Sequence, residues 1–420
     1  MADVNKPKPR SGLIAALDVG TTKMCCFIAK SDGTGNMRIV GIGHHISGGM
    51  RLGNVVDMDA AEHAIRATVE AAEHMAGENI RQVVVGLSGV TAKSRMIAFE
   101  TSISGHEIGD ADLRRVLDPA GLKDEKPEDH EIIHAIPVGY SLDGHRGIRD
   151  PRGMYGEKLG VNMHIISASS GAVRNLSACI ARCHLDIEAK VVAPYASALS
   201  TLVEDEKNLG VTLVDMGGGT TSIAVFFDGE LVHTDAIPAG GQHVTNDIAR
   251  GLSTPLHHAE RMKTLYGSTV PSSSDDHEVI RVPLIGEEES GDTNQVPRSM
   301  LVGIIRPRME EIIEMVGQRL SKAGFDKVAG RRVVLTGGGA LLPGVREMAA
   351  EILDKQVRFG HPIPIDGLAE AAGGPSFATT LGLLRYGAGY IEDTANGTYR
   401  PSDDRAGRVG RIGQWFRENF

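Results

Sequence analysis

The sequence predicts an α/β protein with two similar domains around a cleft and a small α+β subdomain inserted between them. First, 420 residues exceed what one ordinary hydrophobic core accommodates, so two or more domains are expected. Second, a strand, a Gly- and Thr-rich turn and another strand occur at residues 13–29 and recur at residues 210–227. Third, residues 90–169, between these copies, are more polar and carry several Pro-containing loop signals.

The two copies of the repeated unit align closely. Strands are predicted at residues 13–17 and 24–29 in the first copy, and at residues 210–214 and 222–227 in the second. In each copy an apolar strand ends in Asp, turns through Gly and Thr, and returns as an apolar strand, as in LIAALDVG-TTKMCCFIA and VTLVDMGGGTTSIAVFF. This internal duplication predicts two similar domains that face each other.

Composition excludes several classes of protein. With 44 Lys and Arg against 54 Asp and Glu, the formal charge is −10, which argues against a surface that coats nucleic acid. No segment reaches the roughly 18 to 20 continuous apolar residues of a membrane span. Residues 1–10 are polar, contain two prolines, and are predicted to be a disordered tail and not a signal peptide. A cytoplasmic protein is therefore expected.

The cysteines predict no disulfide and no metal site. Cys25, Cys26, Cys179 and Cys183 lie in apolar contexts, which is typical of reduced core residues in a cytoplasmic protein. Cys179 and Cys183 are followed by His184 and could imitate half of a metal site. No second pair of ligands follows at zinc-finger spacing, so metal binding there is not expected.

Periodicity places the remaining elements. Helices are predicted at residues 60–76, 171–183, 194–202, 241–251, 258–266 and 306–323, and further strands at residues 82–87, 279–284 and 332–336. Residues 272–296 are rich in Ser, Asp, Glu and Gly and are predicted to form an exposed hairpin around one of these strands.

The first turn has the chemistry of a phosphate-binding loop, which needs converging backbone N–H groups and a carboxylate to organise Mg²⁺ waters. Gly20 lets the backbone approach an anion without a Cβ clash, and Thr21 and Thr22 offer hydroxyl and amide donors. Asp18 ends the strand and is predicted to hold Mg²⁺ through water. Lys23 is either the counter-charge of the phosphate or a solvent-facing lysine.

The second turn repeats this chemistry, with Asp215 in the place of Asp18. Its residues are Asp215, Gly217, Gly218, Gly219, Thr220 and Thr221. Either loop alone also fits an ordinary β-hairpin turn, but two copies at matching strand positions favour a ligand site. A third element, VVLTGGGALLP at residues 333–343, predicts a strand, a glycine turn (Gly337, Gly338, Gly339) and a helix start whose amides face an anion or ribose. It fits neither a Walker loop nor a dinucleotide fingerprint.

These motifs resemble those of the actin, heat-shock chaperone and sugar kinase superfamily, and within it the FtsA family of bacterial cell-division proteins. DVGTTK and DMGGGTT resemble the two phosphate motifs and TGGGALLPG the adenosine motif, and the resemblance spans residues 11–390. It implies an actin-like fold, a duplicated RNase H-like unit, with ATP and Mg²⁺ as cofactors. In HAERMKTLYG, Glu260 and Lys263 match positions that contact ribose and adenine; Gly241 and Leu342 are also assigned to this site.

The resemblance also implies a division into parts. The expected parts are a first actin-like domain at 11–90 and 170–205 with 375–390, an inserted subdomain at 91–169, a second domain at 206–243 and 331–374, an FtsZ-binding subdomain at 244–330, a linker at 391–404 and a membrane-targeting helix at 405–420.

Residues 405–420 have an interfacial pattern of their own. On a helical wheel the apolar side chains Val409, Ile412, Trp415, Phe416 and Phe420 fall within an arc of about 140°, with Arg411 and Arg417 on either side of it. Arg408 is also assigned to the membrane surface. Trp and Phe next to Arg are typical of a peripheral membrane helix. Three glycines each cost about 1 kcal/mol of helix stability, so the segment is expected to be disordered until an interface orders it. A helix docked on its own domain, or a frayed end, is the alternative.

The resemblance implies a function in division: ATP-dependent actin-like filaments that anchor FtsZ to the cytoplasmic face of the inner membrane at the septum and help recruit later division proteins. Arg298, Arg306 and Arg308 could pair with an acidic FtsZ C-terminal peptide or be solvated helix charges. Because no residue stands out to position an attacking water, slow or absent ATP hydrolysis is expected. A small-molecule kinase, or a pilus or rod-shape actin relative, is the alternative.

Overall fold

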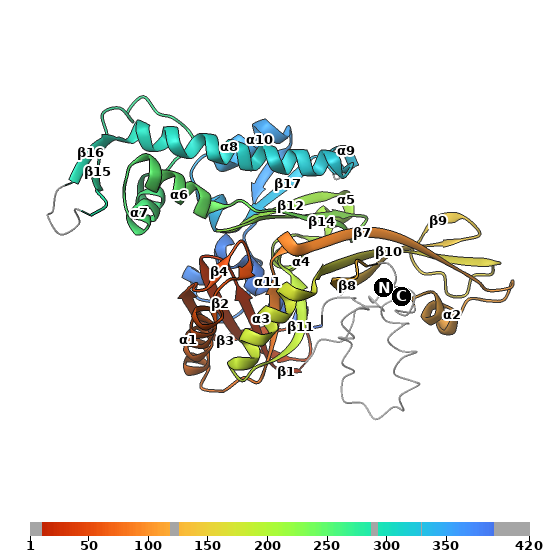
Figure 1. Ribbon diagram of the computed structural model, residues 1–420. Coiled ribbons are helices and arrows are strands. Elements are labelled where there is room, and N and C mark those ends of the chain that lie inside the picture. Colours follow the sequence, from red (N-terminus) through yellow and green to blue (C-terminus); the bar gives the residue numbers. More distant parts are fainter. Residues whose placement is uncertain (1–10, 118–125, 287–292, 329, 390–420) are drawn as a thin grey trace.

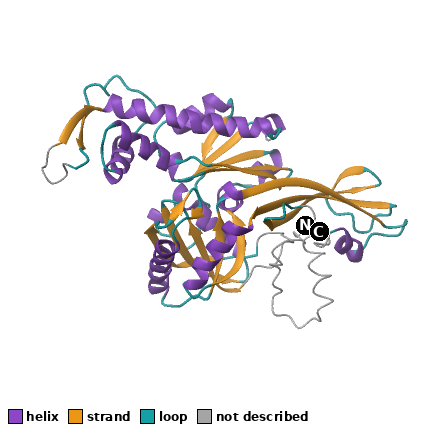
Figure 2. Ribbon diagram, viewed as in Figure 1, coloured by secondary structure: helices purple, strands orange, loops and turns teal. Residues whose placement is uncertain are grey.

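The computed structural model describes residues 11–117, 126–286, 293–328 and 330–389. Two α/β domains lie one above the other, and a third, strand-rich unit extends from between them as an arm (Figure 1). Helices cover the outer faces of the two domains, whereas the arm is mostly sheet (Figure 2). The predicted two-domain fold with an inserted α+β unit is confirmed.

The first domain is built on a five-stranded sheet of order β11-β6-β1-β2-β3. Its strands are β1 (Ser11–Val19), β2 (Lys23–Asp32), β3 (Met37–Ile46), β6 (Gln82–Leu87) and β11 (Asp186–Val192), and its helices are α1 (Met58–Ala76), α3 (Ser170–Arg182), α4 (Ala193–Thr201) and α11 (Ala378–Gly387). Strands β1, β2 and β3 pair antiparallel, while β6 lies parallel to both β1 and β11. A short hairpin, β4 (Met50–Arg51) and β5 (Asn54–Val55), lies beside this sheet's first turn.

The second domain repeats this topology strand for strand. Its sheet has the order β14-β13-β12-β17-β18. The strands are β12 (Val211–Met216), β13 (Thr221–Phe227), β14 (Glu230–Ile237), β17 (Arg332–Thr336) and β18 (Gln356–Phe359). Again a three-stranded antiparallel meander joins two parallel strands. The duplication predicted from two turns therefore extends to all five strands of each sheet.

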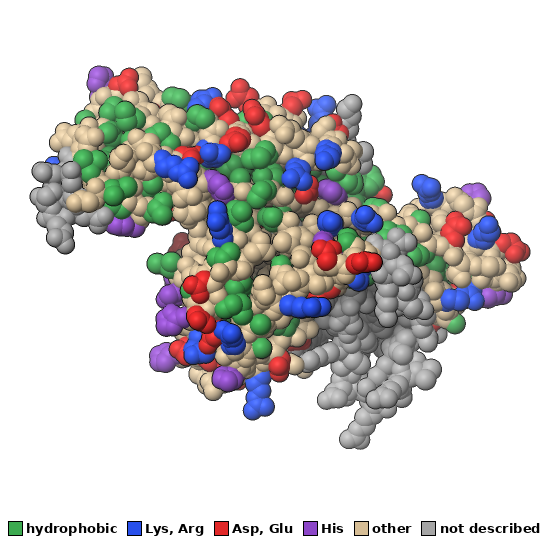
Figure 3. All heavy atoms as spheres, in the orientation of Figure 1, with side chains coloured by type: hydrophobic (Ala, Val, Ile, Leu, Met, Phe, Trp, Pro, Cys, Tyr) green, Lys and Arg blue, Asp and Glu red, His purple; other side chains and the backbone are tan. Residues whose placement is uncertain are grey.

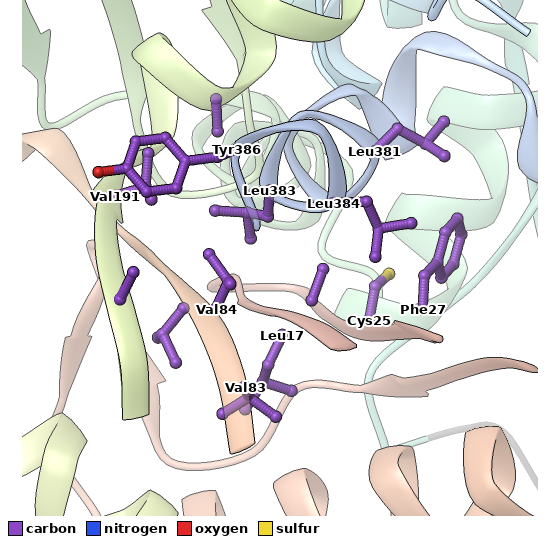
Figure 4. Packing of buried hydrophobic residues seen from close by; sticks show 14 of the residues in the cluster. Leu17, Cys25, Phe27, Val83, Val84, Val191, Leu381, Leu383, Leu384 and Tyr386 are labelled. Atoms are coloured by element: carbon purple, nitrogen blue, oxygen red, sulfur yellow. The ribbon is translucent and has the colours of Figure 1, made fainter. Parts of the chain in front are cut away.

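Burial explains why the repeated strands form. Strand β12 is buried along its whole length, and β1 is buried through its centre, as expected for strands covered on both faces. Helix α11 covers the first sheet: Leu383 and Leu384 lie over Leu17, Val84 and Cys25 (Figure 4). All four cysteines are free, and three of them are buried, in agreement with the prediction of reduced core residues.

The inserted unit has a hydrophobic core of its own. Its antiparallel sheet has the order β7-β10-β8-β9, and α2 (Asp110–Val116) packs against it. The strands are β7 (Ala92–Ser102), β8 (His130–Leu142), β9 (His145–Ile148) and β10 (Lys158–Ser169). Ile103, Leu113, Leu159 and Ile165 are among its buried residues.

A helical layer covers the second sheet. It contains α6 (Gly241–Gly251), α7 (Leu256–Tyr266), α8 (Arg298–Lys322), α9 (Phe325–Val328) and α10 (Val345–Leu353), while α5 (Glu204–Leu209) precedes β12 and the hairpin β15 (Val279–Pro283) and β16 (Thr293–Pro297) precedes α8. The predicted start of the long helix at residue 306 was wrong, because α8 begins eight residues earlier and passes through Pro307. An internal proline costs about 3 kcal/mol; burial of Leu301, Val302 and Ile305, worth about 1.5 to 3 kcal/mol each, offsets it.

Candidate functional site

A cavity of about 270 Å³ lies between the two domains, at the edge where the repeated turns meet. Its walls come from both copies of the repeat and from the segment before α11. The lining residues are Asp18, Val19, Gly20, Thr21, Thr22, Lys23, Gly53, Gly86, Ser88, Ala193, Asp215, Gly217, Gly218, Gly219, Thr220, Ser222, Gly337, Gly338, Pro375, Ser376 and Thr379. We call this cavity the central cleft.

The two turns share one backbone geometry. Gly20 N–H donates to the Lys23 carbonyl at 3.2 Å, and Gly217 N–H donates to the Thr220 carbonyl at 2.9 Å. A Cβ on Gly20 would stand 2.6 Å from that Lys23 oxygen, so only glycine fits this tight turn. The duplicated sequence therefore gives a duplicated loop, and both copies line the cleft.

Each loop is held in place by hydrogen bonds with neighbouring segments. In the first, Gly53 N–H of the β4–β5 hairpin donates to Thr21 Oγ1 at 3.0 Å. In the second, Gly241 N–H, at the start of α6, donates to the Gly217 carbonyl at 3.0 Å. Thr221 Oγ1 donates to the Ala239 carbonyl at 2.8 Å. These bonds fix the loops without using the amides of Gly218 and Gly219.

The two loops touch across the cleft. A Cβ built on Gly218 would lie 2.4 Å from Thr22 Cγ2 and Oγ1, and one on Gly219 would lie 2.5 Å from Thr21 Oγ1. Glycine is therefore required at these two positions by the opposite domain, and not by the backbone angles of the loop itself. The described arrangement is a closed cleft.

Two carboxylates, Asp18 and Asp215, form the floor of the cleft. The pKa of Asp18 is raised to about 6. Burial is the main cause, the nearby charge of Asp215 adds to the rise, and the charge of Lys23 opposes it. Burial also raises the pKa of Asp215. Ser197 Oγ and Thr379 Oγ1 donate to Asp215 Oδ2 at 2.5 and 3.2 Å and favour its charged form. Two buried carboxylates beside these loops can serve as oxygen ligands for a hard cation that keeps its waters.

Lys23 takes a position that the sequence did not predict. Its ammonium lines the cleft but donates to the Ser376 carbonyl at 2.9 Å and lies 3.5 Å from the centre of the Phe377 ring. It therefore bridges the first loop to the segment before α11. Its charge stays in the cleft wall, so the role of phosphate counter-charge stays a prediction.

The third glycine turn contributes only its first two residues to the cleft. Gly337 has a φ of 85° and donates its N–H to the Pro375 carbonyl at 3.2 Å. A 3₁₀ turn, Gly338–Leu341, follows, and α10 begins only at Val345. The predicted helix start is therefore a 3₁₀ turn, and the positive-φ Gly344 separates it from α10.

Some predicted residues lie outside the lining of the cleft. On α7, Lys263 Nζ contacts Glu260 Oε2 at 2.6 Å and the Gly241 carbonyl at 3.2 Å, which places this pair behind the second loop. Leu342 packs against the core of the second domain, Thr221 is buried and Gly339 is half-buried. The residues in this group are Thr221, Gly241, Glu260, Lys263, Gly339 and Leu342.

Sequence reasoning missed Ser88, Ser197 and Thr379. Ser88 follows β6, which lies parallel to β1, so its position at the same sheet edge as Asp18 could have been predicted from topology. Its hydroxyl is buried and has no hydrogen-bond partner among the described residues. Ser197 and Thr379 come from α4 and α11, which are far apart in sequence, and no local signal brings them together.

The arginines predicted to face a partner already hold ion pairs. Their partners are Asp275 for Arg298, Glu310 for Arg306 and Asp247 for Arg308, at N–O distances of 2.5, 2.7 and 2.5 Å. Asp275 is buried, so Arg298 has a structural role. Among the three, Arg306 has the most exposed side chain, at 43%.

Other predictions fall outside the described residues or concern absences within them. The segment 405–420, with the side chains predicted to contact a membrane, lies outside the described part of the chain. Among the described residues, no helix is long and apolar enough to cross a bilayer. The same residues contain no cluster of three or more His, Cys, Asp or Glu placed to hold a metal ion.

Comparison with known proteins bears on the family. The family model for cell division protein FtsA matches residues 212–382, and the model for the SHS2 domain inserted in FTSA matches residues 89–167. The cell division protein FtsA of Agrobacterium fabrum is 42% identical over 424 residues, covering 98% of this chain and 96% of that protein. FtsA of Escherichia coli K12 is 31% identical, covering 97% and 98%.

Solved structures show the fold. The PilM–PilN type IV pilus biogenesis complex superposes with a TM-score of 0.65 at 17% identity, covering 90% of this chain and 99% of that chain. MreB5 of Spiroplasma citri bound to ADP superposes with a TM-score of 0.53 at 14% identity, covering 90% and 96%. These two structures share the actin-like fold, whereas the FtsA proteins also share sequence along nearly the whole chain, so this chain belongs to the FtsA family of cell-division proteins.

Proposed function

We propose that the chain binds ATP and Mg²⁺ in the central cleft, assembles into actin-like filaments and anchors FtsZ to the cytoplasmic face of the inner membrane at the septum. The observation that carries the proposal is the pair of matching loops over two buried carboxylates, Asp18 and Asp215. A triphosphate supplies anionic oxygens for the loop amides, and Mg²⁺ offsets the charge of the buried carboxylates.

Each part of the cleft has a role in this proposal. The amides of Gly218 and Gly219 face the phosphates, and Asp18 and Asp215 hold Mg²⁺ through water. Gly337 and Gly338 face the nucleoside, while Glu260 and Lys263, as an ion pair beside the second loop, support the ribose and adenine end. In the solved MreB5 structures that share this fold, the bound molecules are ADP and AMPPNP, which supports a nucleotide here.

ATP turnover is proposed to be slow or absent. Phosphoryl transfer needs a residue that orients the attacking nucleophile, and the two carboxylates of the cleft are assigned to Mg²⁺. Ala193 also lines the cleft, and its methyl side chain cannot act as a base. Nucleotide binding is therefore proposed to act as a switch of domain closure and filament assembly.

Membrane attachment is assigned to residues 405–420. One such helix is a weak anchor, because its three glycines favour the unfolded chain. Many copies on one filament bind by avidity, so assembly controls attachment. Contact with FtsZ is assigned to residues 244–330, with Arg306 as the most accessible of the three arginines, and later division proteins are assigned to the inserted unit.

Co-sedimentation with anionic vesicles tests this function. The full chain with ATP and Mg²⁺ is expected to bind steeply above an assembly threshold, and a chain ending at residue 404 is expected to stay in the supernatant. Equal binding by both chains contradicts the anchor. Capture on an FtsZ C-terminal peptide, reduced by Arg306→Glu and unchanged by Arg174→Glu on α3, tests the tether separately.

A further inference from the structure

A groove runs along the seam between α8 and α10 and shares no lining residue with the central cleft. It consists of two adjoining hollows of about 470 and 380 Å³, and Glu314 and Ile352 border both. Val270, Met348 and Leu353 add apolar surface to the walls, and the Val270 side chain is half exposed. A groove with an apolar floor on an outer helix layer is a docking surface for an amphipathic segment.

The rim of this groove is acidic. Its lining contains five acids, Glu310, Glu314, Asp326, Glu347 and Glu351, and two bases, Arg306 and Lys355. Glu310 pairs with Arg306 and Glu347 with Arg346, whereas the exposed Glu314 and Glu351 form no ion pair with any described residue. Acidic side chains gather along the edge of the molecule over α8 and α10 (Figure 3). The groove therefore selects a basic occupant.

We propose that residues 405–420 of the same chain occupy this groove when no membrane is bound. This proposal rests on the membrane role assigned to that segment above. The segment carries four arginines against one glutamate, which complements five acids against two bases in the groove lining. Its apolar arc faces the floor and its arginines face the rim.

Length also matches. The stretch from Val409 to Phe420 would be about 18 Å long as a helix, at 1.5 Å per residue. On α8 the groove lining extends from Arg306 to Leu320, which by the same rise is about 22 Å. One amphipathic helix of this size fits within the seam.

The linker between the described chain and the segment is long. Residues 390–404 can extend over about 50 Å. Tethering gives the segment an effective concentration in the millimolar range, so a weak contact is enough to keep it docked.

Docking and membrane binding exclude each other. Both use the arc of Val409, Ile412, Trp415, Phe416 and Phe420, which can be buried in only one place at a time. The groove thus holds the anchor in a monomer and releases it where an anionic lipid surface competes. Apparent lipid affinity is reduced by the fraction of chains that are docked.

Trp415 is the chain's only tryptophan, so intrinsic fluorescence reports the segment directly. In the lipid-free full chain at 50 mM salt, its emission maximum is expected at a shorter wavelength than that of a free 405–420 peptide, and acrylamide is expected to quench it less. Glu314→Lys with Glu351→Lys is expected to shift the emission maximum and the quenching toward the values of the free peptide. The control is Glu70→Lys with Glu370→Lys, which changes the same charge at exposed sites outside the groove and is expected to leave both unchanged.

Vesicle binding gives the second readout. The groove variant is expected to bind vesicles of anionic lipid about 3- to 10-fold more tightly than the control variant, as expected if 70 to 90% of the wild-type segments are docked. Comparison with the control variant removes the general effect of added positive charge. If the lysine pair lowers the melting temperature, Glu314→Gln with Glu351→Gln gives the same test with a smaller expected shift.

Three results overturn the proposal: solvent-exposed Trp415 in the lipid-free wild type, equal behaviour of the groove and control variants, or a tryptophan signal that depends on protein concentration, which indicates docking between chains. Failure of the membrane role looks different, because deletion of 405–420 then leaves vesicle binding unchanged whatever the fluorescence shows.

Discussion

Gly218 tests whether the closed cleft is the state that binds nucleotide. Gly218→Ala adds one methyl group 2.4 Å from Thr22 Cγ2 and Oγ1 on the opposite domain, whereas ordinary contact begins near 3.4 Å. The loops must therefore part by about 1 Å, the difference between these two distances. The backbone of Gly218 has no positive φ, so alanine is compatible with the loop itself.

The size of the effect follows from the clash. Forcing a methyl group into a filled contact costs about 1 to 3 kcal/mol, and this cost applies only when the two domains close. If ATP binds the closed state, its dissociation constant is expected to rise about 5- to 150-fold. The melting temperature of the nucleotide-free protein is expected to change by no more than a few degrees.

Titration calorimetry with ATP and Mg²⁺ measures this directly. The matched control is Gly303→Ala on α8, where an added Cβ meets no atom within 4 Å, and its affinity is expected to equal that of the wild type. Wild-type affinity in Gly218→Ala would refute the reasoning, because the loops would then not touch in the bound state.

Three further predictions concern the fold around the cleft. Because the folded pKa of Asp18 is about 6 against an ordinary value of 3.8 for an aspartate side chain, its contribution to stability is complete below pH 4 and lost as the pH rises through 6. Asp18→Asn is therefore expected to stabilise the nucleotide-free protein against urea more at pH 7 than at pH 5; an equal effect contradicts this. Glu206 is buried and pairs with Arg358 at 2.5 Å, so Glu206→Gln is expected to cost about 3 kcal/mol in urea unfolding, and a loss below 1 kcal/mol would show that the pair is solvated. A Cβ on Gly382 would stand 1.7 Å from the Ala196 carbonyl oxygen, so Gly382→Ala is expected to lower the melting temperature by several degrees at least, and an unchanged melting temperature would contradict this close crossing of α4 and α11.

The duplication and the two loops were predictable because they are local. Gly followed by two Thr residues after an apolar strand that ends at Asp18 or Asp215 specifies the turn, and burial specifies the strands. The inserted unit was predictable from its more polar sequence and its Pro-containing loop signals. In these cases the determining residues are neighbours in the chain.

The rest of the cleft depends on contacts between distant segments. Lys23 reaches Ser376, 353 positions away, and Ser197 meets Asp215 only because α4 packs beneath the second sheet. The early start of α8 depends on burial against the second sheet, which outweighs the local signal of Pro307. Tertiary packing decides these features. Local patterns in the sequence do not reveal which distant segments pack together.

The central claim is that one ATP binds with Mg²⁺ between the loops of Asp18 and Asp215. Its most direct test is calorimetric titration of the wild type and of the double variant Asp18→Asn with Asp215→Asn, with Mg²⁺ and with EDTA. One ATP per chain is predicted for the wild type, with affinity that falls at least about 10-fold, or about 1.4 kcal/mol, on removal of either the metal or the carboxylates. No binding by the wild type, or binding that is indifferent to both changes, would contradict the account.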